Sequence, residues 1–299
     1  MLLSIWPNPQ QPWSDLLDVV QHADQGGWHA AYVWDHFMGD AGDFGEAPVP
    51  TLESSAVLAA LAAATSTIRL GPLVFGNTYR HPAVVANWAA TVDQISSGRL
   101  TLGIGAGWQQ NEHEQYGIEL PQPGVRIAML EEACQVIRTL LDNENSTFDG
   151  RYYTLKSALC EPKPVQPHVP LLIGGKGNRM LRLIARNADQ WNMWSLPDLM
   201  RERSGELERA CGEVDRNPAD IHRSTQALVF ITDDPTQARE LEQRAQPRAA
   251  VAGPPERFAE MVEAWRGVGV DEVIVPDMLL GRGSQRAENL DALKAATRS

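Results

Sequence analysis

The stretch that decides the fold is residues 69–108, RLGPLVFGNTYRHPAVVANWAATVDQISSGRLTLGIGAGW. An apolar run at 69–75 is followed by a helical pattern at 82–95, which has proline in its first turn, and by a second apolar run at 100–104. Alternation of this kind is typical of α/β proteins with a parallel sheet. This segment therefore predicts a strand, a helix and a strand in succession.

The same alternation extends over most of the chain. Working outward from 69–108, we expect eight strands, at residues 2–6, 30–34, 69–75, 100–104, 171–173, 190–194, 227–231 and 272–275. Helices are expected among them, at residues 15–25, 52–64, 82–95, 126–141, 180–186, 199–214, 235–244, 255–266 and 287–296. This order predicts an α/β (β/α)₈ TIM barrel that forms a single domain over residues 1–299. An open doubly wound sheet is the alternative.

Two stretches depart from the alternation. Residues 38–50 are rich in glycine and aspartate and predict a loop. Residues 147–170 contain two tyrosines and four prolines, a proline density that excludes a regular helix or a central strand. We interpret the second stretch as an inserted excursion before the fifth strand.

Composition narrows the classes of partner. The formal net charge of −12 and the absence of a Lys/Arg cluster argue against nucleic acid and anionic membrane surfaces. Residues 1–6 lack the basic start of a signal peptide, and the longest apolar stretches, such as 56–64, are too short to span a bilayer. The three cysteines are widely spaced, and the histidines form no His-Glu-x-x-His motif. We therefore expect a cytoplasmic enzyme that acts on a small molecule and has no metal site.

In a parallel barrel the chemistry lies where the strands end, so the residues that follow each strand are the candidates. Asp35 and His36 follow the second strand. A histidine there can hydrogen-bond a cofactor or substrate carbonyl, or transfer a proton near neutral pH. The alternative is a loop-capping aspartate beside a surface histidine.

Two glycine-rich segments also follow strands. Gly103, Gly105 and Gly107 lie at and directly after the end of the fourth strand, where a backbone without side chains can approach a flat ring, although such a run can equally be a tight turn. The segment does not match Gly-x-Gly-x-x-Gly, and we expect a polar loop after it. That loop contains Asn111 and Glu112, which are either near the barrel mouth or on a solvated acidic face.

The second segment, Gly174-Gly175-Lys176-Gly177, leads from the fifth strand into a helix. Backbone N–H groups at a helix N-terminus favour an anion, and a lysine adds positive charge. We favour a cofactor phosphate as the ligand, with an exposed strand-to-helix turn as the alternative. The segment is not a P-loop, because the Gly-Lys-Ser/Thr ending is missing.

Three segments together resemble the luciferase-like family, particularly its branch that depends on the deazaflavin coenzyme F420. They are YVWDHF at 32–37, GNTYRHPA at 76–83 continuing to SGRLTLGIGAGW at 97–108, and LIGGKG at 172–177 with residues 182–192. The resemblance implies a barrel that binds reduced flavin or F420 at its mouth and exchanges a hydride with a substrate. Members of the family often form dimers, so a homodimer is one expectation. The sequence shows no exposed apolar stripe that would decide between a monomer and a dimer.

The resemblance also implies positions for the cofactor. Asp35 and His36 would lie near its ring, and residues 73–77, which include Val74 and Asn77, would back one face of the ring, often through a non-proline cis peptide. Gly107 and Asn111 would lie near the cofactor. Its phosphate would bind at the glycine segment, namely Gly174, Gly175, Lys176 and Gly177.

One position departs from the family pattern. Sugar-phosphate dehydrogenases of the family carry a glutamate directly after the glycines of the fourth loop, where this chain has Trp108. We therefore do not carry over sugar-phosphate oxidation, and we treat Glu112 as a polar partner in catalysis. The leading hypothesis is an F420-dependent oxidoreductase. The alternatives are an FMN-dependent monooxygenase and a barrel that has lost its cofactor and serves in binding.

Overall fold

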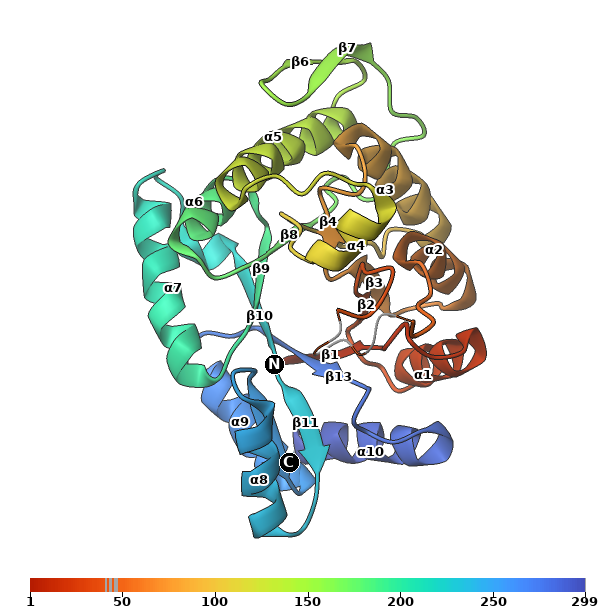
Figure 1. Cartoon of the computed structure of the whole chain (residues 1–299), viewed down its shortest axis with the longest axis vertical. Coiled ribbons are helices and arrows are strands. Elements are labelled where there is room, and N and C mark those ends of the chain that lie inside the picture. The colour runs from red at the N-terminus through yellow and green to blue at the C-terminus, as the bar shows by residue number, and fades with distance from the viewer. Residues whose placement is uncertain (41, 43–44, 46–47, 299) are drawn as a thin grey trace.

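The computed structural model describes residues 1–40, 42, 45 and 48–298. Its centre is a parallel sheet surrounded by helices (Figure 1). The strand order is β3-β2-β1-β13-β10-β9-β8-β5-β4. These strands are β1 (Leu2–Trp6), β2 (Ala30–Val33), β3 (Arg69–Pro72), β4 (Phe75–Gly76), β5 (Leu102–Gly105), β8 (Leu171–Gly174), β9 (Gln190–Trp194), β10 (His222–Gln226) and β13 (Glu272–Pro276).

The sheet closes into a barrel through its two end strands. β3 and β4 are consecutive halves of one barrel strand, separated by a cis peptide between Leu73 and Val74. β4 pairs with β5. β3 also contacts the start of this strand, because the Leu70 carbonyl accepts a hydrogen bond from the N–H of Thr101, the residue directly before β5, at 2.8 Å. The nine strands therefore occupy eight positions around a barrel, which confirms the predicted (β/α)₈ architecture.

Eight helices form a ring around the barrel, each in contact with the next and the last in contact with the first. They are α1 (Trp13–Gln25), α2 (Ser54–Ala64), α3 (Pro82–Ser96), α5 (Pro123–Asp142), α6 (Asn178–Asn187), α7 (Pro197–Gly212), α9 (Pro255–Arg266) and α10 (Gly283–Ala296). Prolines in the first turn of several of them, as at Pro82 and Pro123, suit a position where no backbone N–H is needed.

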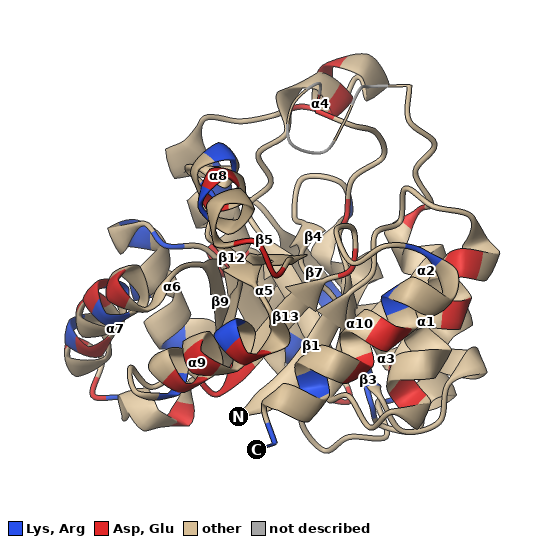
Figure 2. Cartoon of the chain, turned by 90° about the horizontal axis from the view of Figure 1, so that it is seen from below, with Lys and Arg blue, Asp and Glu red and all other residues tan. Residues whose placement is uncertain are grey.

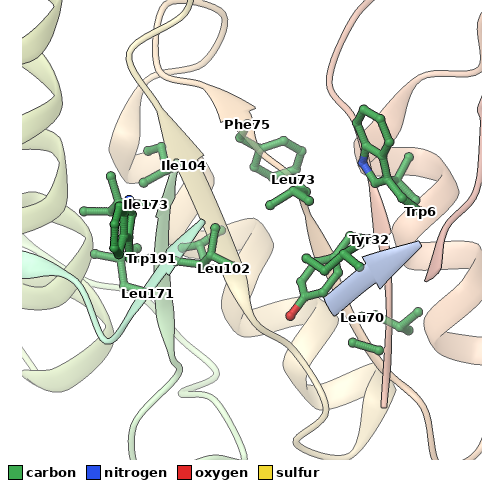
Figure 3. Packing of buried hydrophobic residues seen from close by; sticks show 14 of the residues in the cluster. Trp6, Tyr32, Leu70, Leu73, Phe75, Leu102, Ile104, Leu171, Ile173 and Trp191 are labelled. Atoms are coloured by element: carbon green, nitrogen blue, oxygen red, sulfur yellow. The ribbon is translucent and has the colours of Figure 1, made fainter. Parts of the chain in front are cut away.

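The core fills the barrel and the layer between strands and helices. Figure 3 shows part of it, with Leu70, Leu102 and Ile104 packed among larger side chains such as Trp191. These four side chains are at most 1% exposed. Burying a leucine or isoleucine of this kind contributes roughly 1.5–3 kcal/mol, which explains why most of the strands are apolar on both faces.

The seventh barrel strand differs from the prediction. Residues 227–231 do form a strand, β11 (Leu228–Ile231), but β11 pairs with β12 (Ala250–Gly253) in a separate two-stranded sheet. The barrel position belongs to β10, whose sequence HRSTQ is polar. Its Ser224 and Thr225 are fully buried and hydrogen-bond Asn192 and Ser195. The prediction was wrong because these polar side chains find partners inside the barrel.

Several segments lie outside the ring of helices. The predicted excursion forms an antiparallel hairpin of β6 (Ser146–Asp149) and β7 (Thr154–Ala158), which projects beyond α5 (Figure 1). α8 (Pro235–Ala245) also lies outside the ring. The prediction of a polar loop after Gly107 was wrong, because residues 110–116 form the short helix α4 (Gln110–Tyr116). Of the predicted loop at 38–50, positions 41, 43–44 and 46–47 lie outside the described residues.

Charged residues are spread over the outer helices, with both signs interspersed on α7 and α9 (Figure 2). In this view the chain termini lie at one end of the molecule and α4 at the other, above the strand ends. Within the part of the chain that the structure describes, no helix is long and apolar enough to cross a membrane.

Candidate active site

A cavity of about 420 Å³ opens at the C-terminal ends of the barrel strands. Side chains at or directly after the ends of β1, β2, β9 and β10 line it, together with the segments around β4, β5 and β8. A site at this end, built from several different strands, is the arrangement on which barrel enzymes rely.

The predicted site residues divide into two groups around this cavity. Those that line it are Asp35, His36, Val74, Gly107, Gly174, Gly175 and Lys176. Those that do not line it are Asn77, Asn111, Glu112 and Gly177. Asn77 Nδ2 donates to Tyr153 of the β6–β7 connection at 3.1 Å, and Asn111 Nδ2 donates to the Gly39 carbonyl at 2.7 Å. These two amides therefore hold segments around the mouth.

His36 and Glu112 form the polar centre of the site. His36 Nδ1 lies 2.8 Å from Glu112 Oε1, and the Glu112 side chain is completely buried. Glu112 also accepts from the Phe37 N–H at 2.8 Å and from the Tyr79 hydroxyl. Burial, and then the hydrogen bond to Glu112, raises the pKa of Tyr79 well above its usual range, so Tyr79 remains a donor. Glu112 therefore lies behind His36 and orients its ring.

Asp35 has a different environment. Its carboxylate forms a two-point ion pair with Arg80, at 2.7 and 2.9 Å, and accepts from the Gly76 N–H at 2.9 Å. Burial raises the pKa of Asp35 from its usual value, although Arg80 and Gly76 oppose this shift. Arg80 also lies over the Phe75 ring, 4.6 Å from its centroid. This pair ties the end of β2 to β4 and fixes the backbone that carries His36.

One wall of the cavity consists of very small residues from β5 and β8: Gly105, Ala106, Gly107, Gly174 and Gly175. A Cβ on Gly105 would lie 2.7 Å from Val74 Cγ2, and Gly107 has a φ of +77°. Side chains are therefore disfavoured at these two positions, and the wall presents mostly backbone. Such a wall fits a flat ring system that must approach closely.

The glycine wall continues to the N-terminus of α6. Gly177 is the N-cap residue, and no side chain caps the N–H groups of the first turn. Lys176 lies beside it, is exposed and lines the cavity. The chemistry of this donor set fits a phosphate, because backbone N–H groups, the helix dipole and a lysine combine.

The remaining wall is aromatic, and of its residues we had singled out only Trp108 in the sequence. Trp6, Trp34, Trp108 and Trp194 line the cavity, as does Gln226 at the end of β10. A signal was available, because the predicted strands 2–6, 30–34 and 190–194 all end in tryptophan. Tyr79 was also missed, although it lies in the segment that carries the resemblance. Nothing in the sequence separated Gln226 from other glutamines.

Fold and site define a class of enzyme: an α/β barrel with a cofactor-sized cavity at its mouth. A model of the luciferase-like monooxygenase family matches residues 3–293, and the chain belongs to this family. An F420-dependent glucose-6-phosphate dehydrogenase of Beutenbergia cavernae is 34% identical over 234 residues, which are 76% of this chain and 67% of that relative.

Other relatives match over less of their length. An uncharacterized protein of Mycobacterium tuberculosis is 37% identical over 47% of this chain and 49% of its own, so the chain spans about half the length of that relative. Among solved structures, an F420-dependent secondary alcohol dehydrogenase in complex with an F420-acetone adduct has a TM-score of 0.86 at 21% identity, covering 100% of this chain and 99% of that one. A long-chain alkane monooxygenase reaches 0.83 at 12% identity, covering 100% and 91%. At these identities the structures support the fold.

Proposed function

We propose that this protein is an oxidoreductase that uses coenzyme F420 for hydride transfer to or from a small organic substrate. One observation carries the proposal: His36, oriented by the buried Glu112, shares its cavity with a wall of glycine backbone that leads to the N-terminus of α6, where no side chain caps the first turn. This arrangement supports a cofactor ring against the glycine wall, a cofactor phosphate at the N-terminus of α6 and proton transfer by His36. The F420-dependent dehydrogenases among the sequence relatives support the choice of cofactor.

In this proposal two parts of the cavity would bind the cofactor. Val74, Gly107, Gly174 and Gly175 would contact the ring system, and Lys176 with the N-terminus of α6 would bind the phosphate. When bound, the deazaflavin ring would accept or donate the hydride. Asn77 and Asn111 would act indirectly, because they hold the surrounding segments.

His36 would move the proton that accompanies the hydride. Because Nδ1 is committed to Glu112, the neutral ring carries its lone pair on Nε2. Nε2 would accept the hydroxyl proton when an alcohol is oxidised and return a proton to the oxygen when a carbonyl is reduced. Glu112 would therefore be a positioning residue, and Asp35 would fix the backbone through Arg80.

The second candidate is an FMN-dependent monooxygenase, which the family and the alkane monooxygenase fold neighbour favour. The two candidates differ in their use of oxygen, because reduced deazaflavin reacts poorly with it. Oxygen uptake that depends on substrate and reduced FMN would replace the first proposal with the second.

The test is titration of the purified protein with F420 and, separately, with FMN, following fluorescence quenching. We expect F420 to bind more tightly, and we expect Gly177→Asp to weaken its binding by about tenfold or more because it places a negative charge at the phosphate site. Asp is a favoured N-cap residue, so this variant should not lose stability. Gly205→Asp in α7, where a new Cβ meets no atom within 4 Å, is the matched control.

Three outcomes would contradict the proposal. These are preference for FMN, binding of neither cofactor, and equal effects of the two aspartate substitutions on F420 affinity. The third outcome would leave cofactor binding in place but remove the α6 terminus as the phosphate site.

A further inference from the structure

The aromatic wall forms a continuous series of rings. Trp6 has its ring centroid 5.6 Å from that of Trp194 and 6.0 Å from that of Trp34. The series continues to His36, whose ring centroid lies 5.5 Å from Trp34 and 5.2 Å from Trp108. Because the proton-transfer group is part of this series, a substrate that reacts at His36 also lies against tryptophan. Indole faces and edges favour apolar rings over acyclic polar chains.

Gln226 is a polar residue on this side of the cavity, where Asn192 of β9 also belongs to the lining. Gln226 is the last residue of β10, and the strand register places it beside Trp194. The residue is 3% exposed, it lines the cavity, and its Oε1 has no hydrogen-bond partner among the described residues. An unsatisfied buried amide oxygen is costly, so it points to a ligand that supplies a donor.

Full charges are scarce in this cavity. Among the described residues that line it, only Asp35 and Lys176 carry one. Arg80 and the Gly76 N–H occupy both oxygens of Asp35. Lys176 lies at the proposed phosphate site of the cofactor. Among these lining residues no further lysine or arginine is therefore available for a phosphate on the substrate; Arg248, whose guanidinium lies 5.5 Å from the centroid of the Trp194 ring, is outside the lining.

From these observations we propose that the substrate is an uncharged alicyclic secondary alcohol, or its ketone, with a second hydroxyl group that binds Gln226. The inference rests on the proposed function. The ring lies against the tryptophan series, the reacting carbinol lies at His36, and the distant hydroxyl donates to Gln226 Oε1. β10 and β2 are separated by β13 and β1 in the sheet, so the two polar contacts are at different sides of the cavity.

The reaction balances with groups already named. In oxidation, the carbinol carbon loses a hydride to oxidised F420, and the hydroxyl proton goes to His36 Nε2. The C–H and O–H bonds break, the C=O double bond forms, and the cofactor is reduced by two electrons. The hydroxyl bound to Gln226 takes no part in the chemistry, so Gln226 is a specificity-determining residue.

The test compares trans-1,4-cyclohexanediol, cyclohexanol and glucose 6-phosphate as probes. Dissociation constants are measured by calorimetry with and without F420, and kcat/KM is measured with F420. We expect the diol to exceed cyclohexanol by about tenfold in affinity and in kcat/KM, because cyclohexanol leaves the buried amide unsatisfied. Glucose 6-phosphate should show no binding.

The matched variants are Gln226→Leu and Gln190→Leu. Leucine at 226 should bring the two alcohols to within about twofold of each other. Leucine at 190, which begins β9 at the other end of the barrel and does not line the cavity, should preserve the preference.

The inference is overturned if glucose 6-phosphate binds better than the diol, if neither ring compound binds, or if Gln226→Leu keeps the preference. Binding without cofactor is measured separately from F420 titration, so a failure of the proposed cofactor is distinguished from a failure of the proposed substrate class.

Discussion

Two histidine–glutamate pairs, each built on a buried glutamate, lie at opposite ends of the barrel. At the C-terminal ends of the strands, His36 Nδ1 is 2.8 Å from Glu112, which also accepts from the Tyr79 hydroxyl. At the N-terminal ends, His222 Nε2 is 3.0 Å from Glu272, which also accepts from the Ser4 hydroxyl. Both glutamates are completely buried.

The difference lies in what surrounds each pair. His36 lines the mouth cavity beside the glycine wall, whereas neither His222 nor Glu272 lines that cavity. His222 and Glu272 begin the neighbouring strands β10 and β13, where their contact fastens the base of the barrel. The same set of groups is therefore expected to serve chemistry at one end and stability at the other. Location on the barrel, more than residue type, indicates the role.

The largest expected effect concerns the mouth histidine. His36→Ala should lower kcat by roughly 10²–10⁴-fold, the range typical of general acid–base groups. The dissociation constant of F420 should stay within about threefold, because the proposed cofactor contacts come from the glycine wall. Steady-state kinetics and fluorescence titration measure the two quantities. A variant that retained full kcat would remove His36 from the mechanism.

The second effect concerns pH and the base of the barrel. Burial lowers the pKa of His222, but the hydrogen bond and charge of Glu272, with Asp271, raise it more, so the net shift is upward. A raised histidine pKa stabilises the fold below the ordinary value of about 6.5, and this contribution is lost as pH rises through the shifted pKa.

Nearby His29 has its pKa lowered, chiefly by burial, and therefore contributes a slope of opposite sign. The contribution of His222 is therefore measured as the difference in unfolding free energy between wild type and a His222 variant, in which the slope from His29 is shared. Wild type should lose its advantage in unfolding free energy over His222→Gln as pH rises above about 6.5. Urea unfolding at several pH values measures this difference, and a pH-independent difference would contradict the assignment.

The smallest expected effect concerns Tyr79. Tyr79→Phe removes one of the donors to Glu112 but leaves the Phe37 N–H and His36 in place. We expect kcat to fall by about two- to tenfold, in line with the loss of one hydrogen bond worth about 1 kcal/mol. Cofactor affinity should be unchanged. A loss as large as that of His36→Ala would show that Tyr79 transfers protons itself.

Sequence reasoning found the barrel and part of the mouth. The βαβ rhythm around residues 69–108 identified the architecture, and strand ends pointed to Asp35, His36 and the two glycine segments. β10 was missed because its buried serine and threonine are satisfied by groups in and directly after β9, among them Asn192 and Ser195, a tertiary pairing that no local pattern contains.

The contacts between residues within the site also could not be predicted from local sequence patterns. Glu112 meets His36 across 76 positions of sequence, and it does so because residues 110–116 form α4 where we expected a loop. Asn77 and Asn111 were placed near the cofactor by resemblance, yet their amides bond Tyr153 and Gly39 outside the cavity lining. Hydrogen bonds between distant segments decide such roles.

The most direct test is a side-by-side measurement of Glu112→Gln and Glu272→Gln, recording kcat with F420 and the free energy of unfolding for both. We predict that Glu112→Gln lowers kcat on the order of 100-fold, because a carboxamide disturbs the tautomer and orientation of His36, with a smaller change in stability. Glu272→Gln should instead destabilise the fold by about 3 kcal/mol while folded enzyme keeps its kcat. Equal losses of kcat in the two variants, or the reverse pattern, would contradict the division of roles between the two ends of the barrel.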